Sequence, residues 1–267
     1  CGSIFGQEKN VVNAAIAKMN LFLHGASDFN VMQGDTLRDP KILQGGNIAK
    51  FDCVIANPPF SLENWGATEW SSDKYKRNIY GTPSDSCGDY AWIQHMICSM
   101  VSGQGRMAVV MPQGILFRNQ ETEIRKQLVE SDLIEAVVTL GDKLFYGTGL
   151  SPCFLIIRRM KPAHHFGRIL MIDGSKILTQ KRAQNILEEN DIDRLYSLYQ
   201  NYSDEEDYSR IVTLQEIRDK EYNLSPNRYV VYHKEEIRPY AEVLAEFKHA
   251  YEEVKRLEEE FSLLINA

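Results

Sequence analysis

The chain has 267 residues, of which 43% are hydrophobic and 25% are charged. This balance is typical of folded globular proteins and excludes a disordered chain, and the length predicts one large domain with an appendage. Thirty basic and 37 acidic residues give a net charge of −7, so the whole surface is not a nucleic-acid binder. Any contact with DNA or RNA would need a local basic patch or the help of a partner.

Five cysteines occur, and none belongs to a Cys-x-x-Cys pair. The spacing argues against a zinc site and against a disulfide framework, and we expect a protein of the reducing cytoplasm. No apolar run approaches the length that a bilayer requires, so we expect no membrane contact.

Short apolar runs alternate with helical patterns from Ile4 to about Ile172. In chain order, the patterns predict strands at 4–5, 30–33, 51–56, 107–111, 133–140, 154–157 and 169–172, and helices at 10–24, 89–100 and 120–130. The apolar residues of the first helix lie on one face, and the strand at 51–56 is apolar enough to be buried on both sides. This alternation predicts a doubly wound, mostly parallel, Rossmann-like α/β sheet, whose ligands lie beyond the carboxyl ends of the strands.

Two further segments follow the predicted sheet. We assign residues 1–175 to the catalytic domain, 176–239 to a mixed charged extension and 240–267 to a terminal helix. The helix has apolar residues spaced 4, 3, 4, 3, 4 and 3 apart, at Val243, Phe247, Ala250, Val254, Leu257, Phe261 and Leu264. Such a helix either packs on its own domain or pairs with another chain, and the narrow heptad seam favours pairing.

The sequence Asn57-Pro58-Pro59-Phe60 comes directly after the strand that ends at Ala56. Two prolines that end a strand and set a rigid turn explain part of it. They do not explain the flanking asparagine and aromatic residue.

A chemical role accounts for all four residues. An exocyclic amine on a heterocycle is a poor nucleophile because its lone pair is delocalised into the ring. The Asn57 side-chain oxygen and the Pro58 carbonyl can accept hydrogen bonds from the two N–H groups of the amine, which makes its lone pair available. The prolines fix the direction of the carbonyl in advance. Phe60 can stack on the base, which has to leave the duplex to reach such a pocket.

Asn-Pro-Pro-aromatic after a strand resembles the S-adenosylmethionine-dependent amino-methyltransferases. The ordered surroundings resemble more closely the modification subunit of type I restriction-modification enzymes, a family of N6-adenine DNA methyltransferases. The resemblance rests on Gly6-Gln7-Glu8, Met19-Asn20-Leu21, Gly34-Asp35-Thr36-Leu37, 51–61, 88–96, Gly105-Arg106, 111–114, Leu116-Phe117-Arg118, Gly147-Thr148-Gly149 and 222–229.

The resemblance implies roles in cofactor binding. Glu8 would accept hydrogen bonds from the ribose hydroxyls of S-adenosylmethionine, Asp35 would contact its adenine amino group, and Thr36 would lie beside that ring. Gly2 and Asn57 complete the implied set. For each carboxylate the alternative is a polar strand end or an Asx turn.

One departure from the family concerns its glycine-rich turn. Only Cys1-Gly2-Ser3 matches part of that turn, and Ile4 begins the next strand with no helix between. We expect that residues before this sequence supply the rest, rather than that the chain is naturally truncated.

Two other features carry less weight. Lys74, Lys76 and Arg77 could contact phosphates, but a solvated loop is the commoner reason for such a cluster. Phe145-Tyr146-Gly147-Thr148-Gly149 is glycine-rich without the Gly-Lys-Ser/Thr of a phosphate loop, and the resemblance implies an element of the base pocket near it.

These observations predict methyl transfer from S-adenosylmethionine to the N6 amino group of adenine in double-stranded DNA, without a metal. The resemblance implies a specificity subunit, a restriction subunit and a flipped adenine as partners. One alternative is methylation of a glutamine amide or of RNA, where the same electronic problem arises. Another is a non-catalytic scaffold that lost the glycine-rich turn.

Overall fold

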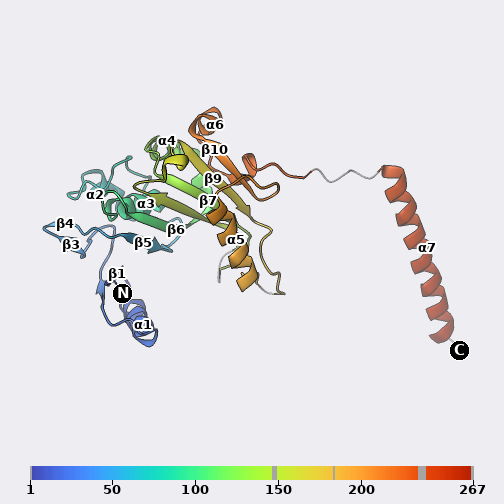
Figure 1. Ribbon diagram of the computed structural model, residues 1–267. Coiled ribbons are helices and arrows are strands. Elements are labelled where there is room, and N and C mark those ends of the chain that lie inside the picture. The colour runs from blue at the N-terminus through green and yellow to red at the C-terminus, as the bar shows by residue number, and fades with distance from the viewer. Residues whose placement is uncertain (1, 146–148, 183, 234–238, 266–267) are drawn as a thin grey trace. The chain divides into compact units, whose positions relative to one another are not determined.

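The computed structural model describes residues 2–145, 149–182, 184–233 and 239–265 (Figure 1). The chain forms two compact units, Cys1–Val231 and Tyr232–Ala267. Each unit is described by itself.

All strands and helices that the periodicity predicts between residues 4 and 172 are present in the first unit. Its strands are β1 (Ile4–Glu8), β2 (Phe29–Gln33), β3 (Leu43–Gln44), β4 (Asn47–Ile48), β5 (Cys53–Ala56), β6 (Arg106–Pro112), β7 (Ile134–Leu140), β8 (Pro152–Arg158), β9 (Arg168–Gly174) and β10 (Ser209–Thr213). Its α-helices are α1 (Val11–Leu23), α2 (Ala67–Ser71), α3 (Asp89–Cys98), α4 (Thr122–Glu130), α5 (Glu189–Asn201) and α6 (Leu214–Asp219).

Six strands form the central sheet, in the order β10-β9-β7-β8-β6-β5. The pairs β5–β6 and β7–β9 are parallel, and the other three pairs are antiparallel. Strand β8 lies between β6 and β7 and runs opposite to both, so the sheet is mixed. The predicted α/β class is confirmed.

Helices cover both faces of this sheet, as doubly wound folds require. Because side chains alternate along a strand, β7 sends Val137 to one core and Ala136 and Val138 to the other. The first core contains Ile93 of α3 and Leu128 of α4. The second core is closed by α5, and β7 is buried along its whole length.

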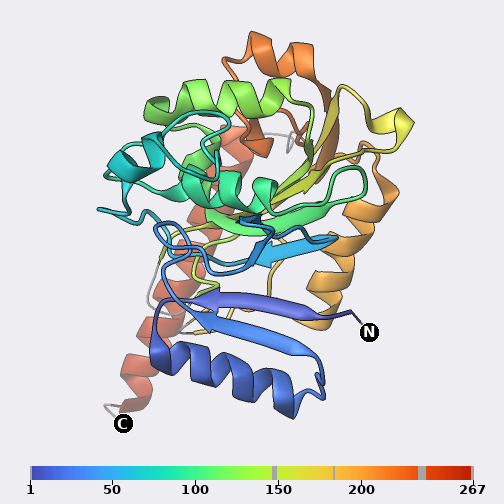
Figure 2. The ribbon, with the colours of Figure 1, turned by 90° about the vertical axis from the view of Figure 1, so that its left-hand side faces the viewer.

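Strands β1 and β2 form a separate, parallel, two-stranded sheet against which α1 packs (Figure 2). Within the described residues, neither strand pairs with the six-stranded sheet. Only Ala14 of α1 is buried, whereas Ile16 and Met19 are each 59% exposed. The apolar face predicted for this helix exists, but described parts of the chain do not cover it.

Strand β5 corrects one prediction. We expected residues 51–56 to be buried on both faces, but Cys53 is exposed and Ile55 is 77% exposed. The two residues share the face of β5 that is open to solvent, whereas Val54 and Ala56 on the other face pack against the first core.

The three-part domain division stays a prediction. Residues Ser209–Thr213 pair with β9 and so continue the central sheet beyond residue 175, and the first unit extends to Val231.

The second unit contains the predicted heptad helix as α7 (Tyr240–Ile265). Its seam residues Val243, Phe247, Val254, Leu257 and Phe261 are exposed. In the described part of the chain, no helix combines the length and the apolar character needed to cross a bilayer.

Candidate active site

The Asn-Pro-Pro-Phe loop leaves the carboxyl end of β5. Asn57 is exposed, Pro58 is buried, Pro59 is exposed and Phe60 is half-buried. The prolines have no N–H to pair, which suits a loop that turns away from an edge strand. In the described residues, no hydrogen bond engages the Asn57 side chain, so its amide is available to a ligand.

A buried carboxylate holds this loop from behind. The Ser61 N–H donates a hydrogen bond of 2.7 Å to Oδ1 of Asp89, the first residue of α3. The Asp89 side chain is completely buried, and its other oxygen accepts a hydrogen bond from the Arg118 guanidinium. Ser61 has a φ of +51°, a conformation that costs a non-glycine residue energy and needs such an anchor.

Arg118 also forms an ion pair with Glu121, at 3.0 Å from Nε to Oε2. Partial burial opposes the charged guanidinium, but the hydrogen bond to Asp89 and the two carboxylate charges raise the pKa of Arg118 above its usual value. For Glu121 burial outweighs the Arg118 charge, and its pKa is raised. The loop, the start of α3 and residues 118–121, which are distant in sequence, therefore meet at this point.

Phe60 contacts a second aromatic ring. The rings of Phe60 and Phe145 meet edge to face, with centroids 6.4 Å apart. Phe145 opens the glycine-rich segment to which the resemblance assigns part of a base pocket. Tyr146, Gly147 and Thr148 lie outside the described residues.

The two carboxylates predicted to bind cofactor lie at the ends of the paired strands β1 and β2. Oε1 of Glu8 accepts a hydrogen bond of 2.7 Å from the Asn10 N–H, and in the described part of the chain its other oxygen has no hydrogen-bond partner and can accept from a ligand. The Gly34 N–H donates to the Glu8 carbonyl at 3.0 Å, so Asp35 follows directly beyond this pairing.

Asp35 forms the Asx turn that was its alternative interpretation. Oδ1 accepts hydrogen bonds from the Leu37 and Arg38 N–H groups, both at 3.1 Å, and Oδ2 lies 2.9 Å from Nζ of Lys9. Burial acts to raise the pKa of Asp35, but Lys9 and the backbone donors outweigh it and the pKa is lowered. The ionised carboxylate remains an acceptor, although its known partners already occupy both oxygens.

The other predicted cofactor residues differ in their surroundings. Gly2 is exposed, and a Cβ added there would meet nothing within 4 Å. Thr36 is half-buried, and its carbonyl accepts a hydrogen bond of 3.0 Å from the Arg77 guanidinium.

Arg77 is therefore neither a phosphate contact nor a solvated loop residue. It is 2% exposed and forms an ion pair with Asp73 at 2.8 Å. Its guanidinium also donates to the Leu37 carbonyl at 2.7 Å and lies 3.1 Å from Nδ1 of His95 in α3. Burial and the Arg77 charge lower the pKa of His95 to about 3, so this ring is neutral. Arg77 thus fixes residues 36–37 to the helix behind the Asn57 loop.

The structure places the predicted residues in two groups. Glu8 and Asp35 share the β1–β2 sheet, and residues 57–60 leave the six-stranded sheet. Side-chain contacts connect the groups, including Arg77 and the rings of Phe5 and Phe51, whose centroids are 5.4 Å apart. Sequence reasoning missed the anchoring roles of Arg118 and Arg77, since the groups that they anchor, at Thr36, Leu37, Asp89 and His95, are 18 to 41 residues away.

No group of three or more described His, Cys, Asp or Glu side chains is arranged to hold a metal ion. The carboxylates of this region are instead engaged by backbone N–H groups and basic side chains.

The chain is similar to known proteins over most of its length. The family model for N-6 DNA Methylase matches residues 2–237. The MjaVII methylase subunit of a type I restriction enzyme from Methanocaldococcus jannaschii is 36% identical, over 96% of this chain and 46% of its own length. The HindI methylase subunit from Haemophilus influenzae is 31% identical, over 85% of this chain and 52% of its own.

The chain is also similar to a solved structure of the same kind of subunit. The type I restriction-modification system methyltransferase subunit from Streptococcus thermophilus has a TM-score of 0.78 and 29% identity, over 85% of this chain and 48% of that chain. The chain thus spans about half the length of the relatives it matches. Since the family model covers well over half of the sequence, the chain belongs to the N-6 DNA Methylase family.

Proposed function

We propose that this chain is part of the modification subunit of a type I restriction-modification enzyme, and that it transfers a methyl group to N6 of adenine in DNA. One observation carries the proposal. In a member of the N-6 DNA Methylase family, the exposed Asn57 stands at the carboxyl end of β5 on a loop that Asp89 holds from behind. The named relatives, methylase subunits of type I restriction enzymes, support the assignment to that system.

The loop acts on the amine through two acceptors. The Asn57 side-chain oxygen and the Pro58 carbonyl accept hydrogen bonds from the two N–H groups of the adenine amino group, which makes the nitrogen lone pair available. Because the loop is braced before the base arrives, this stabilisation needs no reorganisation during the reaction. The amine nitrogen would then attack the methyl carbon in line while the bond from that carbon to the cofactor's sulfur breaks, with S-adenosylhomocysteine as the leaving group. The excess proton on nitrogen would leave to water, so no general base is required.

Phe60 receives the base. An adenine must leave the duplex to reach an exposed loop, at a cost of a few kcal/mol. Stacking on an aromatic ring offsets about 1–3 kcal/mol of that cost. The edge-to-face contact with Phe145 orients the Phe60 ring for this contact.

S-adenosylmethionine supplies the methyl group. The residues at the ends of β1 and β2 fit such a molecule: Glu8 retains an unused carboxylate oxygen for a ribose diol, and the fixed Asp35–Thr36 turn lies beside it. Gly2, Glu8, Asp35, Thr36 and Asn57 would hold it.

The partners are also part of the proposal. We infer that a specificity subunit reads the DNA sequence, that α7 docks it through the exposed heptad seam, and that a restriction subunit joins the complex. Methylation of a glutamine amide or RNA, and a scaffold without activity, are less favoured because the family and the named relatives are DNA methylases.

The test uses the complete gene product, with and without the specificity subunit. Labelled S-adenosylmethionine and DNA are supplied, and the DNA is digested to nucleosides. Label in N6-methyladenine, only with the partner present, supports the chemistry and the division of labour. Label in protein or RNA would indicate the first alternative, and absence of both label and cofactor binding would indicate the scaffold.

A further inference from the structure

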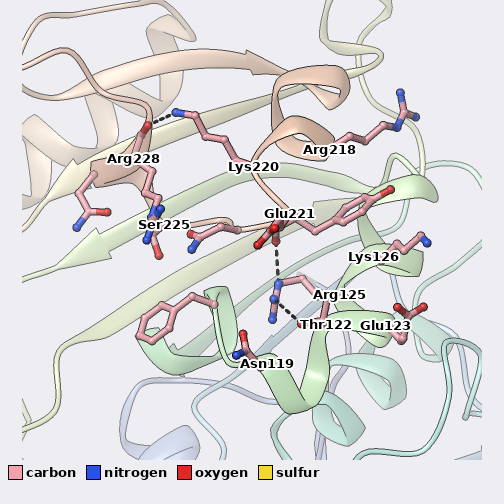
Figure 3. Close-up of a pocket in the computed structure, with 14 residues that line it drawn as sticks. Asn119, Thr122, Glu123, Arg125, Lys126, Arg218, Lys220, Glu221, Ser225 and Arg228 are labelled. Atoms are coloured by element: carbon pink, nitrogen blue, oxygen red, sulfur yellow. Dashed lines mark hydrogen bonds between the residues drawn. The ribbon is translucent and has the colours of Figure 1, made fainter.

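A polar cleft of about 770 Å³ lies between α4 and the turn that follows α6 (Figure 3). Five of its fourteen lining residues are basic and two are acidic. This excess of positive charge contrasts with the net charge of −7 of the chain. The cleft is therefore the kind of local basic site that an acidic protein needs to bind a polyanion.

The basic residues divide into structural and available groups. Arg125 is buried, and its guanidinium donates to the carbonyls of Tyr222 at 2.8 Å and Arg118 at 2.9 Å. Arg218 forms an ion pair with Glu130 at 2.6 Å, and the Lys220 ammonium donates to the Arg228 carbonyl. By contrast, Lys126 and Arg228 are exposed, and no carboxylate in the described parts of the chain pairs with either of them.

The wall of the cleft is rigid. Consecutive residues Glu221 and Tyr222 have φ values of +55° and +57°, which non-glycine residues adopt only where their surroundings hold them. Arg125 supplies this hold through the Tyr222 carbonyl, and the Leu224 N–H donates to the Leu116 carbonyl at 2.9 Å. The available cations thus stand on a preformed surface, which reduces the entropy lost on binding.

Hydrogen bonds connect one end of the cleft to the candidate active site. Phe117 lines it and is 48% exposed. The next residue, Arg118, binds Asp89, which holds Ser61 beside Phe60. Because β5 and β6 are parallel, the segments that carry Phe60 and Phe117 leave the same edge of the sheet.

We propose that this cleft binds the phosphodiester backbone of the DNA strand, with Lys126 and Arg228 as the main phosphate contacts. This inference rests on the proposed function, because it places the strand beside the loop that receives its adenine. Phosphate oxygens accept hydrogen bonds from lysine, arginine and asparagine side chains, and Asn227 adds an exposed amide to the rim.

The test compares the double variant Lys126→Ala/Arg228→Ala with the wild type in the complete complex. Fluorescence anisotropy with a duplex of unrelated sequence gives the affinity as a function of KCl concentration. Each lost phosphate contact reduces the slope of log K against log salt by about one. We therefore expect the slope to fall by about two in the double variant. The matched control is Arg106→Ala, at the opposite end of β6, which should leave the slope unchanged.

An unchanged slope in the double variant would overturn the inference. If the specificity subunit is also lost from the double variant in gel filtration, the cleft binds an acidic protein surface instead of DNA. The two proposals fail separately. If the wild-type complex forms N6-methyladenine but the double variant has an unchanged slope, only the phosphate-binding role of the cleft is refuted. If the double variant has a reduced slope but the wild-type complex never methylates adenine, only the proposed activity is refuted.

Discussion

Asp89 fixes the backbone of Ser61 through a hydrogen bond of 2.7 Å, and so determines where the loop that begins at Asn57 ends. The carboxylate is fully buried and is charge-balanced by Arg118. A group that never needs to touch substrate thereby sets the position of the groups that do.

Asp89→Asn is therefore expected to impair methyl transfer more than stability. Arg118 retains Glu121, so the free energy of unfolding should fall by about 1–3 kcal/mol, the cost of a poorly satisfied buried group. A shift of the loop by about 1 Å can reduce turnover about 100-fold. Kcat, the Kd for S-adenosylmethionine and urea unfolding curves separate these effects.

Glu121→Gln is the matched control, because it removes the other carboxylate of Arg118 but leaves the Ser61 anchor. It should reduce stability and largely retain kcat. Equal losses of kcat in the two variants would contradict a positioning role for Asp89.

Asn57→Ala should abolish measurable methyl transfer. Loss of one preorganised partner in such a site reduces kcat by about 10²–10³ at least. Because Asn57 is exposed, folding should not change appreciably. S-adenosylmethionine should still bind, because Gly2, Glu8, Asp35 and Thr36 remain to hold it. Asn30→Ala, at an exposed asparagine of β2, is the control, and normal turnover by Asn57→Ala would refute the mechanism.

Phe60→Ala should weaken capture of the target base. Loss of stacking worth about 1–3 kcal/mol corresponds to a decrease in kcat/KM of roughly 5- to 150-fold. A duplex with a mismatch at the target adenine should restore part of the loss, because its base leaves the helix at lower cost. Phe60→Tyr keeps the ring and should retain most activity, whereas an equal defect on matched and mismatched DNA would argue against stacking.

The Asp73–Arg77 pair predicts a pH dependence of stability. Burial acts to raise the pKa of Asp73, but the hydrogen bonds and charge of Arg77 outweigh it and lower the pKa. The stabilisation is therefore fully present above the pKa of the unfolded chain, about 3.9, and is lost as the pH falls through the lower folded value.

Urea unfolding between pH 3 and pH 6 checks this prediction. Asp73→Asn should be less stable than the wild type at pH 6, and the difference should shrink below about pH 4. A difference that stays constant over the whole range would show that the charge of Asp73 does not stabilise the fold.

Deletion of residues 240–267 should abolish assembly with the specificity subunit. The remaining chain should unfold as before, since Cys1–Val231 forms a compact unit of its own. In the intact chain, Phe247→Glu/Leu257→Glu places charges on the exposed seam and should have the same effect, whereas Lys248→Ala should not. Unchanged assembly in native mass spectrometry would refute docking through α7.

The sequence predicted what local pattern encodes. Periodicity located the helices and strands up to residue 172, and four adjacent residues marked the Asn57 loop. The prediction that β5 is buried on both faces failed. Apolar composition shows that a strand can be buried, but the elements packed around the strand decide whether it is buried. The role of Arg77 was also missed, since its acceptors at Thr36 and Leu37 come from a distant turn.

Among the residues that the structure describes, β5 pairs with β6 alone, and its other edge has a further consequence for how the chain behaves at high concentration. An unpaired edge presents backbone N–H and C=O groups that accept another strand almost regardless of its sequence. Here Ile55 and the apolar side chains of α1 lie in contact with solvent. Preparations limited to these 267 residues should therefore show self-association, seen as light scattering that grows with protein concentration, and a lysine at position 55 should suppress it.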